Sequence, residues 1–387
     1  MQKETELVIA LSRTPLRAGA HDRVARLLTE PVDWDAIRNL AVQWQVEPTV
    51  CGNLRTEFAA AMPRPVLDDF TALERNARTY AVTRTLLLVN LVRDFDRAGI
   101  SVIVLKGPAV AIAAYGDYSR RTFGDVDLLV RRNDLPAARD FLLARGFVRD
   151  YADGMEPALI SDQHALEFSD QRTKVELHWS LLSRHLRFDL GPDQLWDRAE
   201  TVACMDVDIR VLAPEHLFLY LCAHGAKHEW MLFRWILDVV QLAQRMTPAE
   251  AERVMTLAER SNTKRILALA LRIAGETFGE KEFPFPPRAM LPERDTRALA
   301  TLVKARLDPG ATGGTELLPP RLARIHPYIG TLAFWIRARE RTRDQVACAA
   351  RFLFVPAASD TESGVLYGLL RPARLVVTAL KRIVHAS

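Results

Sequence analysis

Hydrophobic residues recur at helical spacing through the first quarter of the chain. From Glu4 to Asp96, leucines, alanines and aromatic residues return on one face of successive helical turns, which predicts amphipathic helices. Prolines such as Pro31, Pro48 and Pro63 interrupt this pattern and divide it into separate helices. The pattern therefore predicts an N-terminal helical region.

Between Gly99 and Pro214 the pattern changes to short apolar runs rich in β-branched residues. One segment in this part, from Leu135 to Arg145, keeps helical spacing and is followed by Gly146, as is typical of a helix C-terminus. A mixed α/β core is the simplest interpretation. The predicted strands are 101–105, 126–130, 166–168, 175–179 and 209–212.

Helical spacing returns after Pro214, in the segments 215–243, 248–259, 264–278 and 297–306. A turn-rich segment, 309–320, precedes a basic portion in which the arginines of 337–351 are interpreted as a solvated helix face. The apolar run 369–385 predicts a packing helix. We thus expect three parts: a helical region at 1–97, an α/β core at 98–213 and a helical domain at 214–387.

Length and composition support a folded protein of several domains. The chain of 387 residues exceeds one typical core, and 49% of it is hydrophobic and 26% charged. A formal net charge of +4 is small for this length, so a nucleic-acid partner is not expected. The 4 cysteines form no C-x-x-C pair, which disfavours structural zinc and a disulfide framework.

The compartment follows from the same kind of evidence. The N-terminus carries charges on both sides of a very short apolar run, unlike a secretory signal. No apolar stretch approaches the ~18 residues that a spanning helix needs. We expect a cytoplasmic protein without a transmembrane segment; the sequence does not indicate its oligomeric state.

Two aspartates on one predicted strand are the first chemical signal. Asp125 and Asp127 follow Gly124 and alternate with apolar residues, so both side chains project from the same face of the strand. Adjacent carboxylates repel unless a cation lies between them, and Mg²⁺ typically binds one or two carboxylates together with substrate phosphates. A solvated strand face or a turn pair is the alternative.

A third carboxylate lies on a later predicted strand, KVELHW, from Lys174 to Trp179. Glu176 and His178 alternate with Val175 and Leu177 and so face away from the core. If this strand neighbours the first, three carboxylates meet and can hold two metal ions, roughly 3.5–4 Å apart. An exposed Glu176, or one paired with Lys174, is the alternative.

The ordered combination of motifs resembles the uncharacterised nucleotidyltransferases of the polymerase-beta-like superfamily. It comprises Lys106-Gly107, the run R-x-x-GDVDLLV that begins at Arg121, the strand ending in His178-Trp179, and the segment HGAKH…WILD that ends at Asp238. The resemblance covers roughly 100–242. The usual Gly-Ser pair is Gly107-Pro108 in this chain, and the gap to Asp125 is longer than the common pattern.

The resemblance implies an α+β fold with a small mixed sheet between helical regions. It also implies metal-dependent transfer of a nucleoside monophosphate from an NTP, with ATP favoured, to a hydroxyl of a small molecule, sugar, peptide or protein. Asp125, Asp127 and Glu176 would be the catalytic residues that bind Mg²⁺ or Mn²⁺. The nucleotide would be bound by Lys106, Gly107, Arg121, Gly124, His178, His224, Lys227 and Asp238.

Alternatives stay open for several of these residues. The alternative for Lys106-Gly107 is the ordinary end of a strand before a helix. For Arg121 it is a surface arginine, and for His178 a packed strand histidine. His224 and His228 have zinc-pair spacing, but no HExxH glutamate or third ligand accompanies them. For His224, Lys227 and Asp238, the alternative to nucleotide binding is a buried, hydrogen-bonded histidine beside a Lys227–Asp238 ion pair.

Two other functions remain to be separated from nucleotidyl transfer. A catalytically silent member of the fold would bind a nucleotide or a partner protein as a scaffold. A phosphotransferase would move the γ-phosphate, but the chain contains no glycine-rich P-loop for that reaction.

Overall fold

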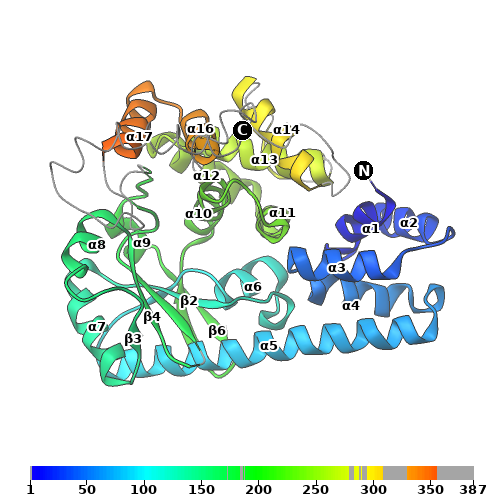
Figure 1. The fold of residues 1–387 in the computed structure, drawn as a ribbon, viewed down its shortest axis with the longest axis horizontal. Helices are drawn as coiled ribbons and strands as arrows, with labels where there is room; N and C mark the ends of the chain where they lie inside the picture. Colours follow the sequence, from blue (N-terminus) through cyan, green and yellow to red (C-terminus); the bar gives the residue numbers. More distant parts are fainter. Residues whose placement is uncertain are drawn as a thin grey trace, which may run out of the picture.

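The computed structural model describes residues 2–278, apart from 172, 184–185 and 187, and also 283–286, 289, 294–307 and 329–354. The predicted turn-rich segment 309–320 and the predicted packing helix 369–385 lie outside these residues. The described part combines many helices with one mixed sheet, so the mixed α/β class is confirmed. Figure 1 shows the sheet on one side, with C-terminal helices above it and a long helix along the base.

The N-terminal region is helical, as predicted. Asp33 accepts a hydrogen bond from the backbone N–H of Ala36 and so caps the third helix. The last helix has 34 residues and begins with a proline in its first turn, where a missing N–H has no helical partner to lose. The elements are α1 (Lys3–Leu11), α2 (Ala18–Leu27), α3 (Trp34–Trp44), α4 (Glu47–Glu57), η1 (Ala59–Ala61) and α5 (Arg64–Arg97).

A seven-stranded sheet with the order β3-β4-β5-β2-β1-β7-β6 forms the core of the middle region. The β2–β5 and β1–β7 pairs are parallel, and the others are antiparallel. The predicted strands are confirmed within a few residues. The strands are β1 (Ile103–Val104), β2 (Asp125–Leu129), β3 (Val148–Arg149), β4 (Ala165–Ser169), β5 (Lys174–His178), β6 (Glu200–Cys204) and β7 (Val207–Val211).

The sequence pattern did not predict the two edge strands. Both residues of β3 are exposed, and β6 buries Cys204 at its end. Such strands lack the apolar alternation by which a half-buried strand is recognised. The helices and turns of this region are α6 (Pro108–Tyr115), η2 (Tyr118–Arg120), η3 (Arg132–Asp134), α7 (Leu135–Ala144), α8 (Glu156–Asp162) and α9 (Pro192–Asp197).

The described part of the C-terminal region is mainly helical, but the predicted continuous helix 215–243 was wrong. It is two helices, because Glu229 and Trp230 adopt positive φ angles of 53° and 55° between them. The predicted solvated arginine face also needs a correction, since Arg339 is buried with its guanidinium 5.0 Å from the ring centre of Trp335. The helices are α10 (Pro214–Lys227), α11 (Phe233–Arg245), α12 (Pro248–Arg260), α13 (Lys264–Phe278), α14 (Arg294–Arg306), α16 (Ile329–Ala338) and α17 (Thr342–Phe354).

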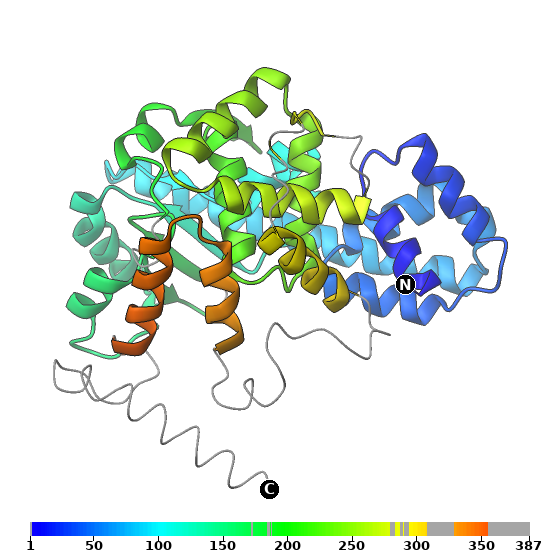
Figure 2. The same cartoon turned by 90° about the horizontal axis from the view of Figure 1, so that it is seen from above.

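Two clusters of buried apolar residues hold these elements together. One joins the N-terminal helices to the C-terminal helices and includes Trp44 and Phe233, whose ring centres are 4.4 Å apart. The other lies between the sheet, α7 and the second half of α5, which contributes Val89 and Phe95. Seen from above (Figure 2), α1–α4 form one end of the molecule and α10–α13 lie over the middle. This packing places α11 against α6, the helix that follows β1. The boundaries 1–97, 98–213 and 214–387 stay a prediction.

Candidate functional site

Parallel pairing of β2 with β5 brings the predicted carboxylates together. Asp127 lies directly opposite Glu176 in the register of the two strands, so their side chains project from the same face of the sheet. His178, two residues after Glu176, projects from that face as well. Ligand atoms of the three residues all lie within 4.8 Å of one another.

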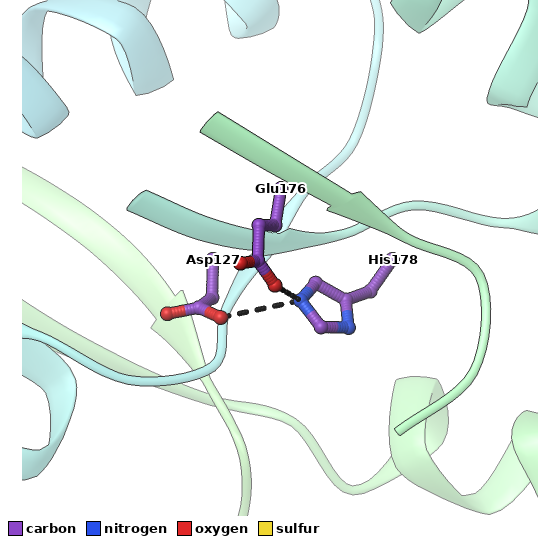
Figure 3. A group of neighbouring side chains, drawn as sticks. All are labelled: Asp127, Glu176 and His178. Carbon is purple, nitrogen blue, oxygen red and sulfur yellow. Dashed lines mark hydrogen bonds and ion pairs between the residues drawn. The ribbon is translucent and has the colours of Figure 1, made fainter. Parts of the chain in front are cut away.

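One ring nitrogen of His178 points at both carboxylates (Figure 3). Its Nε2 atom is 3.2 Å from Oδ1 of Asp127 and 3.3 Å from Oε2 of Glu176. Burial by itself lowers the pKa of His178, but the hydrogen bonds to the two carboxylates outweigh it and raise that pKa. The arrangement therefore favours a protonated imidazole between two ionised carboxylates.

Lys106 supplies the second positive charge at this point. Its Nζ atom is 2.7 Å from Oδ1 of Asp127, and both side chains are largely buried. Burial tends to raise the pKa of Asp127, yet the neighbouring Lys106 and His178 lower it well below its usual range. Asp127 is thus held as a carboxylate.

The donor set fits a divalent cation. Oδ2 of Asp127 is buried and, among the described residues, has no hydrogen-bond partner, a condition that costs stability unless another ligand satisfies the oxygen. Carboxylate oxygens are the ligands of Mg²⁺ and Mn²⁺, and imidazole nitrogen also binds Mn²⁺ and other transition metals. Asp125 is not part of the tight group, but it lies beside it on the cavity wall.

A cavity of about 700 Å³ opens over this cluster, within the size range of small-molecule sites. It lies between the sheet and the α10–α11 pair. Of the residues assigned catalytic or nucleotide-binding roles from the resemblance, eight line it: Lys106, Gly107, Arg121, Asp125, Glu176, His178, His224 and Lys227.

Gly107 occupies a position that only glycine fits well. Its φ is 61°, and a Cβ there would come within 3.1 Å of the Phe123 ring. Pro108 then begins α6, in the first turn, where its missing N–H costs no helical hydrogen bond. Gly124 has open space where a Cβ would lie, so no steric constraint of this kind acts there.

Asp238 lies behind the cavity wall, fully buried, and holds other side chains in place. Its carboxylate accepts hydrogen bonds from Nε and Nη2 of Arg121 at 2.8 to 3.0 Å and from the hydroxyl of Tyr115 at 2.9 Å. Its ion-pair partner is therefore Arg121, and the Lys227–Asp238 pair considered from the sequence does not form. The bonds tie α6 and the segment before β2 to α11.

Histidines form much of the wall on the α10 side. Burial, and next the charge of Lys106, hold the pKa of His224 well below its usual range. Burial and the charge of Lys227 lower the pKa of His228 to about 4. Both rings are thus neutral near pH 7. Lys227 lies with Nζ 3.4 Å from Nε2 of His164.

Sequence reasoning missed several residues that line the cavity. Tyr220, Arg234 and Trp235 belong to the segment that was treated as one apolar helix. Arg234 and Trp235 follow the break between α10 and α11, so a continuous helix would point them elsewhere. Asp150 and Tyr151 follow the unpredicted strand β3 and also line the cavity. Tyr220 could have been found from the sequence, because it lies one helical turn before His224 on the same helix. Arg234 and Trp235 could not, because hydrophobic periodicity continues across the break after Lys227.

The fold and the site together define a mixed α/β protein whose cavity places carboxylates next to lysine, arginine and neutral histidine side chains, a combination typical of enzymes that act on phosphate esters. The chain belongs to a family described as uncharacterised nucleotidyltransferase, whose family model matches residues 30–279. The family indicated by the sequence motifs is thereby confirmed. No curated protein matches the chain.

Family membership assigns the general chemistry, transfer of a nucleotidyl group. The matched residues run from just before α3 to the end of α13 and include the whole sheet and the cavity. Within the described part of the chain, no helix combines the length and the apolar character needed to cross a membrane.

Proposed function

We propose that the protein is a metal-dependent nucleotidyltransferase built on a polymerase-beta-like core. It transfers a nucleoside monophosphate from an NTP, ATP in the first instance, to a hydroxyl group of an acceptor and releases pyrophosphate. The observation that supports this most is the alignment of Asp127 with Glu176 on neighbouring parallel strands. Two residues so distant in the sequence meet where a metal-dependent phosphoryl transfer needs them.

Asp127 and Glu176, with Asp125 beside them, would hold Mg²⁺ or Mn²⁺. When bound, the cation supplies charge neutralisation for the transferred phosphoryl group and for the leaving pyrophosphate. His178 keeps the two carboxylates aligned through its Nε2 contacts. Lys106 and His178 both contact Oδ1 of Asp127. In this proposal, the contact holds the charge of Lys106 next to the reacting phosphate.

The cavity wall opposite the sheet would receive the NTP. Lys227 from α10 and the α6 N-terminus after Gly107 offer positive charge to its phosphates. Gly107 and Gly124 let the ligand approach the backbone, and His224 contacts it as a neutral ring. Arg121, with Asp238, fixes the segment that leads into Asp125. The chain then acts by positioning and electrostatics and needs no covalent intermediate.

Metal binding and turnover test the proposal in separate measurements. Electron paramagnetic resonance measures Mn²⁺ binding. We expect D127N and E176Q to weaken this binding by about 100-fold or more, because each removes a charged ligand. Pyrophosphate release from NTP in the presence of candidate acceptors should fall in parallel. D208N, a change of an exposed carboxylate on β7, is the matched control and should alter neither quantity.

Unchanged Mn²⁺ affinity in both variants would remove the metal assignment. The Lys106–Asp127 ion pair also balances charge without a metal, which favours a catalytically silent scaffold as the second candidate. That candidate gains support if NTP and Mg²⁺ bind but no pyrophosphate is released with any acceptor of a broad panel.

A further inference from the structure

Arg234 places a guanidinium in the wall of the cavity. Its Nη1 atom donates a hydrogen bond to the backbone carbonyl of Thr122 at 2.6 Å. Its Nε–H is buried and has no acceptor in the described part of the chain. No carboxylate of the described residues lies within ion-pair distance of Arg234. A buried cation of this kind calls for an anion.

Asp238, the carboxylate with the largest electrostatic effect on Arg234, is already paired with Arg121. Both oxygens of Asp238 accept hydrogen bonds from Arg121, and one also accepts from Tyr115. Two guanidinium groups therefore share Asp238 as their main carboxylate, and Asp125 and Glu47 also interact electrostatically with Arg234. Burial, and next the charge of Arg121, lower the pKa of Arg234 to about 10, so the group still carries its charge near pH 7.

The position of Arg234 is fixed by the core. It lies in the first turn of α11, directly after Phe233, which is fully buried and stacks on Trp44. The turn before it is held by Trp230, whose ring packs on Gly225, and by an ion pair of 3.0 Å between Glu229 and Arg306. The guanidinium is thus presented by rigid backbone, which favours specific recognition of a ligand.

The proposed function, on which this inference rests, supplies an anion of the right kind. We infer that Arg234 binds the β- and γ-phosphates of the NTP, and hence the pyrophosphate product, through guanidinium N–H groups that Thr122 does not engage. Its Nη1 meanwhile holds the segment that leads into Asp125. A guanidinium offers two parallel N–H groups to a phosphate, a geometry that a lysine does not reproduce.

Lys227 adds a second cation to the same wall. In the described residues it makes no ion pair with a carboxylate, and its contact is with His164. Lys227 and Arg234 lie on opposite sides of the α10–α11 turn and both line the cavity. A polyphosphate between them would neutralise two charges at once, whereas a monophosphate group would reach fewer of these donors.

Binding of inorganic pyrophosphate, measured by isothermal titration calorimetry on the full chain, tests the inference. We expect R234Q to weaken binding by about 10- to 100-fold, the range for a lost hydrogen bond to a charged group. R234K, which keeps the charge but loses the fork, should fall between R234Q and the parent. R210Q, at an exposed position on β7, should bind as the parent does.

Each outcome has a defined meaning. Mn²⁺ affinity should be the same in R234K and the parent, because the lysine ammonium can still donate to the Thr122 carbonyl. Circular dichroism checks that both variants are folded; if R234Q does not fold, R234K carries the comparison. Pyrophosphate binding that is unchanged in R234Q and R234K, or absent in the parent, overturns the inference. A different outcome is that R234Q loses pyrophosphate binding but the parent never releases pyrophosphate from an NTP. That outcome would remove the proposed function and leave Arg234 as an anion-binding residue.

Discussion

The two aspartates of β2, two positions apart, occupy different environments. Asp127 is 2% exposed and touches Lys106 and His178, which lower its pKa, whereas burial and the charge of Asp127 raise the pKa of Asp125. The fold therefore stabilises the charged form of Asp127 and destabilises the charged form of Asp125. Their shared strand face was predictable from the sequence, but this difference depends on Lys106 and His178, whose register the sequence does not reveal.

The stabilities of two variants should reflect that difference. In the presence of a chelator, D127N should lower the free energy of unfolding by about 3 kcal/mol or more, because it leaves the charges of Lys106 and His178 without their shared partner. D125N should be neutral or stabilising, since it removes a carboxylate whose charged form the fold disfavours. Urea denaturation of both variants measures this; equal losses would contradict it.

The α10–α11 turn decides which faces of the two helices reach the cavity. Gly225 makes the turn possible, because the Trp230 ring occupies the space beside it. Helical spacing in the sequence located α12 and α13 well, where each helix is uninterrupted. It failed at 228–232, because hydrophobic periodicity continues across the turn and the left-handed residues there, Glu229 and Trp230, are not glycines.

Adding one methyl group at this turn should be costly. A Cβ at Gly225 would lie 2.4 Å from the Trp230 ring, so G225A should destabilise the protein by about 1–3 kcal/mol or more through overpacking. G19A is the matched control, since a Cβ there meets nothing within 4 Å in α2, and alanine favours a helix by about 1 kcal/mol over glycine. Thermal denaturation compares them; a G225A protein as stable as G19A would show that Trp230 can move away.

On the scale of the whole molecule, the N-terminal and C-terminal helices share one apolar core, although the sheet separates them in the sequence. Local patterns predicted both sets of helices from their spacing. They could not predict this contact, because the hydrophobic spacing of a helix shows which face is buried but not which distant helix packs on it. The same limit applies to the site, where Asp127 and Glu176 were recognised as residues but their register was not.

A shared core predicts cooperative unfolding. W44A removes a side chain that is 6% exposed and stacks on Phe233 of α11, so it should cost about 3–5 kcal/mol. It should also shift the transition of the whole chain, with circular dichroism and tryptophan fluorescence changing together. V42A, on the exposed side of the same helix at 42% exposure, should change stability by less than about 0.5 kcal/mol. Two separate transitions in W44A would mean that the helical regions unfold independently.

The length of α5 has a mechanical consequence. Its 34 residues span about 50 Å at 1.5 Å per residue, and Figure 1 shows them running beneath both ends of the molecule. A continuous α-helix of this length is expected to keep its end-to-end distance when a ligand binds. We therefore expect any rearrangement around a bound nucleotide to move other elements relative to α5. Spectroscopic labels at the two ends of α5 would report a constant distance and serve as an internal reference.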